Sequence, residues 1–275
     1  MVYGKSRYKF GGYDNYEFHA KLNLDVQEGV MVDKYGLEAI DFQTSATALM
    51  MDTYIKSLGV IDGKVETILD LGCGYGGATK AVGNYFGAQK LYGVDGDAKA
   101  MLKAQSRGIN TINANLETDS LPIPSGCCDV VMCNGVLEHL RYYDNAIIEA
   151  HKALKIGGFF VVTIPNLGSY VNRLPLFFGY QPSDVVISSQ VRIGVLIMNR
   201  KHTINHIHAA TIKAMTQLLE YYKFKIISVK KGDPRLHQPP FNKWWWFFRI
   251  VGSFCTVGWS RRVIVIAQKI GVDSE

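Results

Sequence analysis

The sequence predicts an α/β fold in which a mostly parallel sheet carries helices on both faces. Between residues 66 and 164, short apolar runs alternate with segments of helical periodicity. Strands separated by helices imply βαβ crossovers, and such crossovers produce a parallel sheet that is buried on both faces. The first of these strands runs into four glycines within six positions, which indicates a turn that a ligand approaches closely.

The predicted elements follow one another in order along this central region. Strands are expected at residues 67–71, 90–94, 110–114, 129–134 and 159–164. Helices are expected between them at residues 78–86, 98–106 and 145–154. The strand at 159–164 is rich in β-branched residues, which favour a pleated conformation.

Further elements flank this region on both sides. Residues 211–222 predict a helix capped by Thr211, with four apolar side chains at helical spacing: Ile212, Met215, Leu218 and Leu219. Strands are expected at 225–229 and 262–267, and an earlier helix at 41–58 closes near Gly59.

Two stretches, residues 165–210 and 233–260, fall outside the alternation of strands and helices. Both leave the same end of the predicted sheet or join its last strands. Long insertions in a compact domain are more often functional than accidental. We therefore expect them to cover a working face of the sheet.

Composition restricts the class of protein only loosely. The chain has 275 residues, 48% hydrophobic and 20% charged, with a formal net charge of +6. Lysines and arginines are scattered, so a nucleic-acid partner is not expected. None of the five cysteines lies in a CxxC pair, so neither a zinc site nor a disulfide framework is expected. Unpaired cysteines and an N-terminus without an apolar signal core predict a cytoplasmic protein.

The glycines after the first strand predict a ligand site. They allow positive φ, and the helix that follows directs free N–H groups to the same place. Gly72, Gly74 and Gly77 fit the GxGxxG pattern, and Asp95 follows at the end of the next strand. That spacing suits a dinucleotide such as NAD, whose ribose is held by an acid at this position. A tight turn without a ligand is the alternative.

Three details argue against a dinucleotide. Asp70 stands directly ahead of the glycines, where a carboxylate does not help a pyrophosphate but can receive a cationic amino group or orient the loop. The motif begins after about 65 residues that already include a predicted helix, whereas a dinucleotide fold usually opens near its first strand. The third detail is the segment 121–140, LPIPSGCCDVVMCNGVLEHL, in which a proline-bearing loop precedes a buried strand with a polar exit.

These motifs together resemble class I S-adenosylmethionine-dependent methyltransferases. DLGCGYGG at 70–77 matches the first motif of that family, GVDGD at 93–97 the second, and CDVVMCNGVLEHL at 128–140 the strand-four signature. The resemblance covers residues 41–164 and continues more thinly beyond them. It implies a Rossmann-like fold with a seven-stranded, mostly parallel sheet. We expect residues 1–60 to form an N-terminal arm and helical cap, and residues 61–275 the core, with the two insertions as a substrate lid.

The resemblance also implies a cofactor, S-adenosylmethionine, with S-adenosylhomocysteine as product. The glycine loop would lie along the methionine moiety, Asp95 would hold both ribose hydroxyls, and the residues after the third strand would flank adenine. In that position the family usually has an acid, whereas this sequence has Asn115, whose amide oxygen can still accept from the adenine amino group. The implied cofactor-binding residues are Asp70, Gly72, Cys73, Gly74, Gly76, Asp95, Gly96, Asn115, Leu116, Glu117, Asn134 and Gly135.

Candidate catalytic residues follow the fourth strand. Methyl transfer to an activated carbon relies largely on positioning, and a general base helps when the acceptor is a hydroxyl. Glu138 and His139 are the ionisable pair nearest the expected methyl group. We expect His139 to act as a base or to orient the substrate; the alternative is that it caps the adjacent helix and packs on the cofactor.

Histidines 202, 206 and 208 form a second cluster, just before the helix at 211–222. The segment partly resembles one in methyltransferases of polysaccharide and lipid-linked sugar pathways, which implies a substrate-side role for His206 and His208. Imidazoles and carboxylates suit divalent ions, so a metal held by Glu138, His139 and these histidines is conceivable. Capping or surface histidines are the commoner outcome, and no metal is expected.

The two insertions supply the remaining candidates. Asn166 and Tyr170 are the expected substrate contacts in a lid over the methyl donor, and a packed irregular arm is the alternative. The aromatic segment 241–259 is interrupted by Lys243 and Arg249, and a span there would place the last strand across the membrane. We expect it to be buried in the core or in a homodimer interface, with peripheral membrane contact as the alternative.

The sequence therefore predicts S-adenosylmethionine-dependent methyl transfer to a small-molecule acceptor, with a sugar or lipid-linked intermediate as the leading class. Two alternatives stay open. NAD-dependent oxidoreduction fits the GxGxxG pattern but would need a substrate domain that the sequence does not reveal. A non-catalytic, cofactor-binding subunit that scaffolds a membrane or RNA partner is the other.

Overall fold

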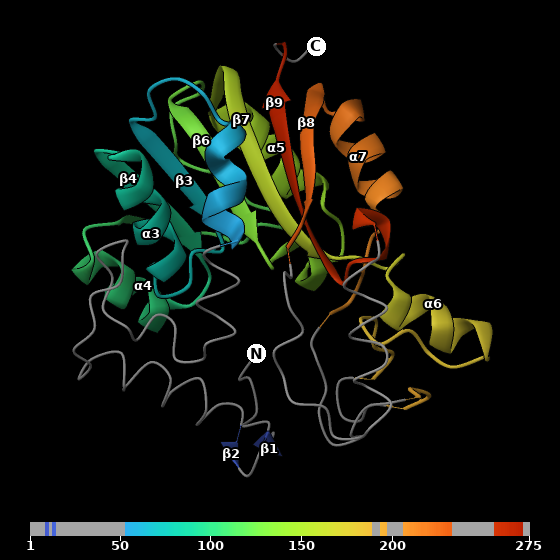
Figure 1. Ribbon diagram of the computed structural model, residues 1–275. Helices are drawn as coiled ribbons and strands as arrows, with labels where there is room; N and C mark the ends of the chain where they lie inside the picture. The colour runs from blue at the N-terminus through green and yellow to red at the C-terminus, as the bar shows by residue number, and fades with distance from the viewer. Residues whose placement is uncertain are drawn as a thin grey trace.

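The computed structural model describes residues 9–10, 13–14, 53–188, 193–196, 206–232 and 256–271. Its main body is a seven-stranded sheet in the order β5-β4-β3-β6-β7-β9-β8, in which β9 runs antiparallel to both neighbours. A separate two-stranded hairpin pairs β1 (Lys9–Phe10) with β2 (Tyr13–Asp14). Figure 1 shows helices packed on both sides of the large sheet, which confirms the predicted α/β fold.

The strands of the large sheet lie close to their predicted positions. They are β3 (Thr67–Leu71), β4 (Lys90–Asp95), β5 (Asn110–Asn113), β6 (Cys128–Asn134), β7 (Leu154–Pro165), β8 (Phe224–Lys231) and β9 (Arg262–Lys269). The largest difference is in β7, which begins five residues earlier than predicted. Leu154 pairs with Cys128, and the register then shifts before Phe159 pairs with Val130. Alternating apolar periodicity does not reveal such an irregularity.

The helices also follow the prediction, with one addition. They are α3 (Gly77–Phe86), α4 (Ala98–Ser106), α5 (Asp144–Ala153), α6 (Tyr170–Phe177) and α7 (Ile212–Tyr221). Short 3-10 helices are η2 (Leu58–Val60), η3 (Leu137–His139) and η4 (Val257–Trp259). The Thr211 hydroxyl accepts from the Ala214 N–H at 3.2 Å, which confirms the predicted cap of α7. Helix α6 was not predicted, because the first insertion lacks a clear helical period.

The central strands are buried on both faces, as the crossovers predict. On one face Leu69 and Leu71 pack with residues from α5 and α7. On the other, Ile68 packs with Val82 of α3 and with residues from 54 to 61. Adjacent residues of one strand thus belong to two separate cores.

The order of the strands creates a crevice between β3 and β6. The chain moves outward in one direction from β3 through β4 to β5, and in the other from β6 to β7. Ligands of open α/β sheets bind at such a switch point, beyond the carboxyl ends of the strands. Both predicted insertions meet this edge, because β7 and β8 end there and β9 begins there (Figure 1).

Several expectations fall partly or wholly outside the described residues. Of the predicted helix at 41–58, the structure describes residues 53–57, which are helical and lead into η2. His202 and residues 241–255 of the aromatic segment are not described. Within the described residues, no helix is both long and apolar enough to cross a membrane. Strands β8 and β9 pair in one sheet. This pairing is the reason against a membrane span in the aromatic segment between them.

Candidate functional site

The turn after β3 is held against the neighbouring strand by its backbone. The Gly72 and Cys73 N–H groups both donate to the Val94 carbonyl, at 2.7 and 3.0 Å. Gly72 has a φ of +79°, and a Cβ there would lie 2.3 Å from Cγ2 of Val136. Glycine is therefore required at residue 72 both by conformation and by the loop that follows β6.

Gly74 and Gly76 serve different purposes within the same turn. At Gly74, whose φ is +51°, a Cβ would meet no atom of the described residues within 4 Å, so among these residues the backbone is open to a ligand. At Gly76, a Cβ would lie 2.4 Å from Cδ1 of Ile109, inside the protein. A ligand can therefore approach Gly74, whereas Gly76 permits the helix α3 to pack closely.

Asp70 is buried at the carboxyl end of β3 and is only half paired. Its Oδ2 accepts a hydrogen bond from the Thr79 hydroxyl at 2.6 Å, while Oδ1 is buried and accepts none from the described residues. The pKa of Asp70 is raised to about 7, chiefly by burial; the Thr79 hydrogen bond opposes this shift, and the nearby Asp95 adds to it. An unpaired carboxylate oxygen suits a cationic amino group, one of the two roles that the sequence predicts for Asp70.

Asp95 is fixed at the end of β4 by two backbone donors. Its Oδ2 accepts from the Gly74 N–H at 2.8 Å, and its Oδ1 accepts from the Asp97 N–H at 2.9 Å. Each carboxylate oxygen can still accept a further hydrogen bond. Asp95 is thus oriented beside Gly74 and can receive two hydroxyl groups. A Cβ on the neighbouring Gly96 would likewise meet no atom of the described part of the chain within 4 Å.

The loop after β5 is tied to the loop after β6. The Asn115 amide oxygen accepts from the Glu117 N–H at 2.9 Å, and the Glu117 carboxylate accepts from the Arg141 N–H at 2.6 Å. Leu116, between them, is buried. The predicted adenine contact through Asn115 stays a prediction, and its amide oxygen would have to share the Glu117 donor. Oδ2 of Asp119 accepts a hydrogen bond from the Asn115 N–H at 2.8 Å, a contact that the sequence did not predict.

The exit of β6 lies on the opposite side of the crevice. Asn134 pairs in register with Thr163 of β7, and Gly135 has a φ of +68° and donates to the Thr163 carbonyl at 3.2 Å. The phenol of Tyr54 lies near the Asn134 side chain; burial raises the pKa of Tyr54, against a smaller opposing effect of Asn134. The predicted contact of Asn134 and Gly135 with the methionine end is compatible with this position.

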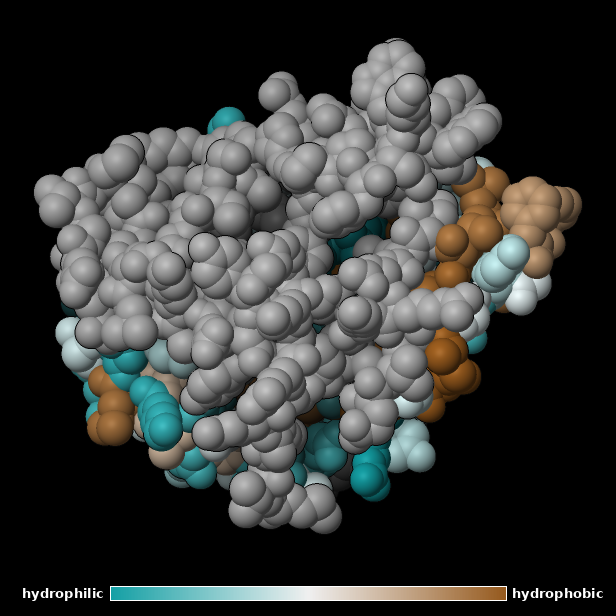
Figure 2. Space-filling model, turned by 90° about the horizontal axis from the view of Figure 1, so that it is seen from below, coloured by the Kyte–Doolittle hydropathy of each residue, from teal (hydrophilic) through white to brown (hydrophobic). Residues whose placement is uncertain are grey.

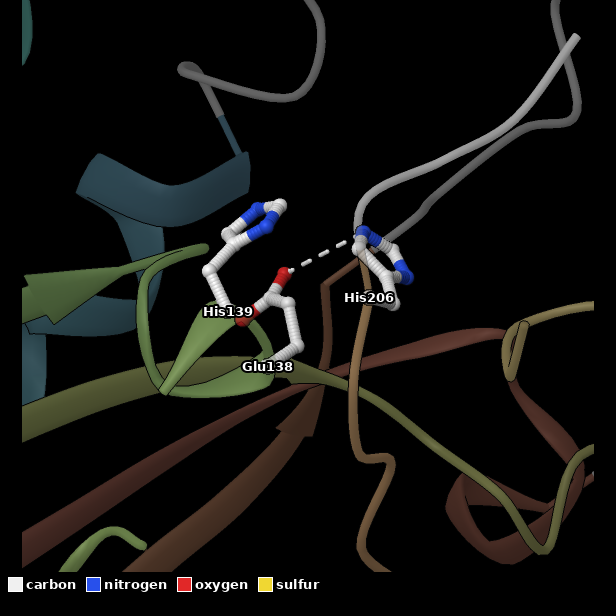
Figure 3. Close-up of side chains that lie close together, drawn as sticks. All are labelled: Glu138, His139 and His206. Carbon is white, nitrogen blue, oxygen red and sulfur yellow. Dashed lines mark ion pairs between the residues drawn. The ribbon is translucent and has the colours of Figure 1, made fainter. Parts of the chain in front are cut away.

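The structure brings Glu138 and His139 of η3 together with His206 (Figure 3). Oε1 of Glu138 lies 3.8 Å from Nε2 of His206, and the two imidazole rings meet edge to face at 5.1 Å. The backbone explains the approach, because the Glu138 carbonyl accepts from the Ile207 and His208 N–H groups at 2.8 and 3.3 Å. The side chain of His208 itself is exposed.

Burial governs the charges of this cluster. It raises the pKa of Glu138, an effect that Arg262 and His139 oppose. Burial and, to a smaller extent, the neighbouring His139 lower the pKa of His206 to about 4. His206 is therefore neutral at pH 7, and its 3.8 Å approach to Glu138 is too long for a hydrogen bond.

Asn166 joins the two insertions. Its buried amide donates to the Gly258 and Ser260 carbonyls at 3.0 and 2.9 Å, and its amide oxygen accepts from the Gly168 N–H at 2.9 Å. These bonds favour a structural role over direct contact with a substrate. Tyr170, at the start of α6, is buried, and its predicted contact with substrate stays a prediction.

A buried polar network supports this junction, and the sequence analysis missed it. Asn172 donates to Asp184 at 3.0 Å, and Arg261 pairs with the same carboxylate at 3.3 Å. Asn172 and Asp184 are both buried. Thr79, the partner of Asp70, was missed in the same way, since a threonine inside a helix carries no distinctive sequence signal.

Figure 2 views the molecule from the side of the carboxyl edge of the sheet. Hydrophilic surface is visible in a recess near the middle of this face, and hydrophobic surface gathers along one side, on the side where Figure 1 places α6. Leu176, Phe177 and Phe178 at the end of α6 are each more than half exposed.

Comparison with known proteins identifies the central part of the chain. Residues 69–162 match the family model described as "Methyltransferase domain". A protein of Mycolicibacterium smegmatis named "Probable S-adenosylmethionine-dependent methyltransferase" is 30% identical over 101 residues, which are 36% of this chain and 38% of that protein. The chain spans less than half the length of the first curated relatives that it matches.

Solved structures show the same fold at low sequence identity. A SAM-dependent methyltransferase from Archaeoglobus fulgidus gives a TM-score of 0.54 at 16% identity, covering 84% of this chain and 97% of that one. Geranyl diphosphate C-methyltransferase from Streptomyces coelicolor, in complex with Mg²⁺, geranyl diphosphate and S-adenosyl-L-homocysteine, gives 0.50 at 15%, covering 81% and 79%. The predicted class I methyltransferase fold is thereby confirmed.

Proposed function

We propose that this chain, which carries a methyltransferase domain in the class I S-adenosylmethionine-dependent fold, transfers a methyl group from S-adenosylmethionine to a small-molecule acceptor. The observation that carries the proposal is the arrangement at the switch point between β3 and β6. Among the described residues, Gly74 has an open backbone, Asp95 is oriented beside it, and Asp70 has a buried oxygen without a hydrogen-bond partner below the turn.

These residues suit the cofactor better than they suit a dinucleotide. A second buried carboxylate under the glycine turn would repel a pyrophosphate but would attract the ammonium group of a methionine moiety. The Asp95 carboxylate can accept both ribose hydroxyls while it keeps its two backbone donors. The complex of the Streptomyces coelicolor protein with S-adenosyl-L-homocysteine supports the same ligand class in this fold.

When bound, S-adenosylmethionine supplies a methyl group on a sulfonium that leaves as a neutral thioether. The chain's own part is to hold both reactants in line and to exclude water, which can supply much of the acceleration. At the exit of β6, His139 is exposed, and its imidazole is a group that can accept a proton from a hydroxyl acceptor.

We further propose that the acceptor is a sugar or a lipid-linked intermediate. The support is the partial match of the segment around His206 to methyltransferases of such pathways, together with the position of His206 beside Glu138. Similar proteins include a malonyl-acyl carrier protein O-methyltransferase and a geranyl diphosphate C-methyltransferase, so acceptors vary widely among them.

The acceptor class can be tested with methyl-labelled S-adenosylmethionine. The purified chain is incubated with separate fractions of a cell extract: water-soluble small molecules, extracted lipids, nucleic acid and protein. The proposal predicts that label enters the small-molecule or the lipid fraction and that Asp95→Asn abolishes most of it. Label confined to nucleic acid or protein would contradict the proposal for the acceptor, although not for the cofactor.

A further inference from the structure

The cluster of Glu138, His139 and His206 has the composition of a metal site. One ligand atom from each residue lies within 4.8 Å of the others, and the three side chains point toward a common space (Figure 3). Ligands at right angles around a divalent ion with bonds of 2.0–2.2 Å lie about 3 Å apart. Small side-chain rotations would therefore be enough to bring the three atoms onto one ion.

Glu138 provides a second, independent indication. Its side chain is 99% buried by exposed area, its Oε2 has no hydrogen-bond partner among the described residues, and its Oε1 reaches only the 3.8 Å contact with His206. A buried carboxylate without partners is costly unless a cation compensates it. Arg262 lies near the same loop, yet within the described residues it forms no ion pair with Glu138.

The backbone holds the ligands in place before any ion arrives. Glu138 and His139 are adjacent in η3. The hydrogen bonds from the Ile207 and His208 N–H groups to the Glu138 carbonyl hold the segment that follows His206 against η3. Prior fixation of ligands lowers the entropic cost of binding. Because His139 is exposed, the site is also open to solvent and to a second ligand.

We propose that Glu138, His139 and His206 bind one divalent transition-metal ion, and that open coordination positions on it bind an oxygen atom of the acceptor. Two imidazoles and one carboxylate suit ions such as Mn²⁺, Fe²⁺ or Zn²⁺ and leave positions free for other ligands. The role toward the acceptor rests on the proposed function, whereas binding of the ion does not.

The ion would change what His139 contributes to methyl transfer. With one ring nitrogen on the ion, His139 would no longer accept the hydroxyl proton of the acceptor. The ion would lower the pKa of that hydroxyl instead, and the proton would pass to solvent. The resulting oxygen forms the bond to the methyl carbon, the carbon–sulfur bond breaks, and its electron pair stays on sulfur. The charges balance, since a sulfonium and an alkoxide give two neutral products.

Binding of Mn²⁺ to the metal-free protein, followed by electron paramagnetic resonance and titration calorimetry, tests the site. The wild-type chain should bind one Mn²⁺ ion, and Glu138→Gln, His139→Gln and His206→Gln should each weaken binding at least tenfold. Glu220→Gln, which makes the same change on the exposed face of α7, should bind as wild type does. Absence of binding, or equal binding in all variants, would overturn the proposal.

Two further measurements keep folding and function separate from metal binding. Thermal melting of each variant checks that it is folded. Because His139 is exposed, His139→Gln should disturb folding least of the three. Affinity for S-adenosylhomocysteine should be unchanged in all three variants. A protein that binds Mn²⁺ at this cluster but not S-adenosylhomocysteine would contradict the proposed function and leave the metal site standing.

Discussion

At the scale of single residues, the pairing of Asp70 with Thr79 has the clearest chemical consequence. The Thr79 hydroxyl satisfies one carboxylate oxygen, while the other stays buried without a partner among the described residues. Burial raises the pKa of Asp70 to about 7. In the folded protein Asp70 therefore changes charge close to neutral pH. Its attraction for a cationic ligand should change over the same pH range.

This pKa predicts a pH dependence with a defined sign. The folded pKa lies above the ordinary value, so the contribution of Asp70 to stability is present below about pH 4 and is lost as the pH rises through about 7. Ligand binding should follow the opposite course, because an ammonium group prefers the ionised carboxylate. Between pH 6 and pH 8, affinity for S-adenosylhomocysteine should rise by about tenfold.

Titration calorimetry of wild type and Asp70→Asn across this range checks the assignment. The asparagine variant should bind more weakly at pH 8 and lose most of the pH dependence. Asp97→Asn, which changes a nearby carboxylate that caps α4, is the matched control and should keep the dependence. A parallel pH profile in wild type and Asp70→Asn would show that Asp70 does not meet the amino group.

At the scale of elements, the turn between β3 and α3 contains glycines that pack against described residues, Gly72 and Gly76, and one that does not, Gly74. Gly72→Ala places a methyl group 2.3 Å from Val136 at a positive φ, and should destabilise the fold by about 1–3 kcal/mol. Val136→Ala in the same chain should restore part of that loss. Gly74→Ala meets no atom of the described residues within 4 Å and should cost about 1 kcal/mol of stability, from backbone strain.

The two substitutions should differ in ligand affinity. Gly74→Ala should weaken binding of S-adenosylhomocysteine more than tenfold, because its methyl group would occupy space that the ligand needs. Urea unfolding and calorimetry on the same samples measure both quantities. Wild-type affinity in a folded Gly74→Ala variant would mean that no ligand lies against this turn.

Most elements were predictable because their sequence signals are local. The strands β3 and β6 are mostly apolar and buried, and the N-cap of α7 is a threonine immediately before a helical period. The early start of β7 and the whole of α6 were not predictable in this way. The first depends on a register shift against β6, and the second on tertiary burial of Tyr170 and Val171.

The same distinction applies to the candidate site: residues with a local sequence signal were predictable, and contacts between distant segments were not. Asp70, Gly74 and Asp95 were predicted because a turn of this kind leaves a fixed spacing in the sequence. The approach of His206 to Glu138 depends on backbone hydrogen bonds between segments about 70 residues apart, which no local pattern encodes. The partners of Asn166 lie still further along the chain, so its role as a junction was not predictable.

At the scale of the whole molecule, the sheet places all of these groups at one edge. The turn after β3, the ends of β4 and β6, and both insertions meet at the carboxyl ends of the strands (Figure 1). The same edge therefore carries the proposed cofactor site beside β3 and β4 and a cluster of ionisable groups beside β6. The central claim is that the ligand in the crevice is S-adenosylmethionine and not a dinucleotide.

Thermal denaturation with S-adenosylhomocysteine and with NAD, each at saturating concentration, tests this claim most directly. A ligand that binds only the folded state raises the melting temperature. S-adenosylhomocysteine should stabilise the wild-type chain and NAD should not, and Asp95→Asn should lose about 1.5–3 kcal/mol of the binding free energy. Stabilisation by NAD alone, or by neither ligand, would contradict the account.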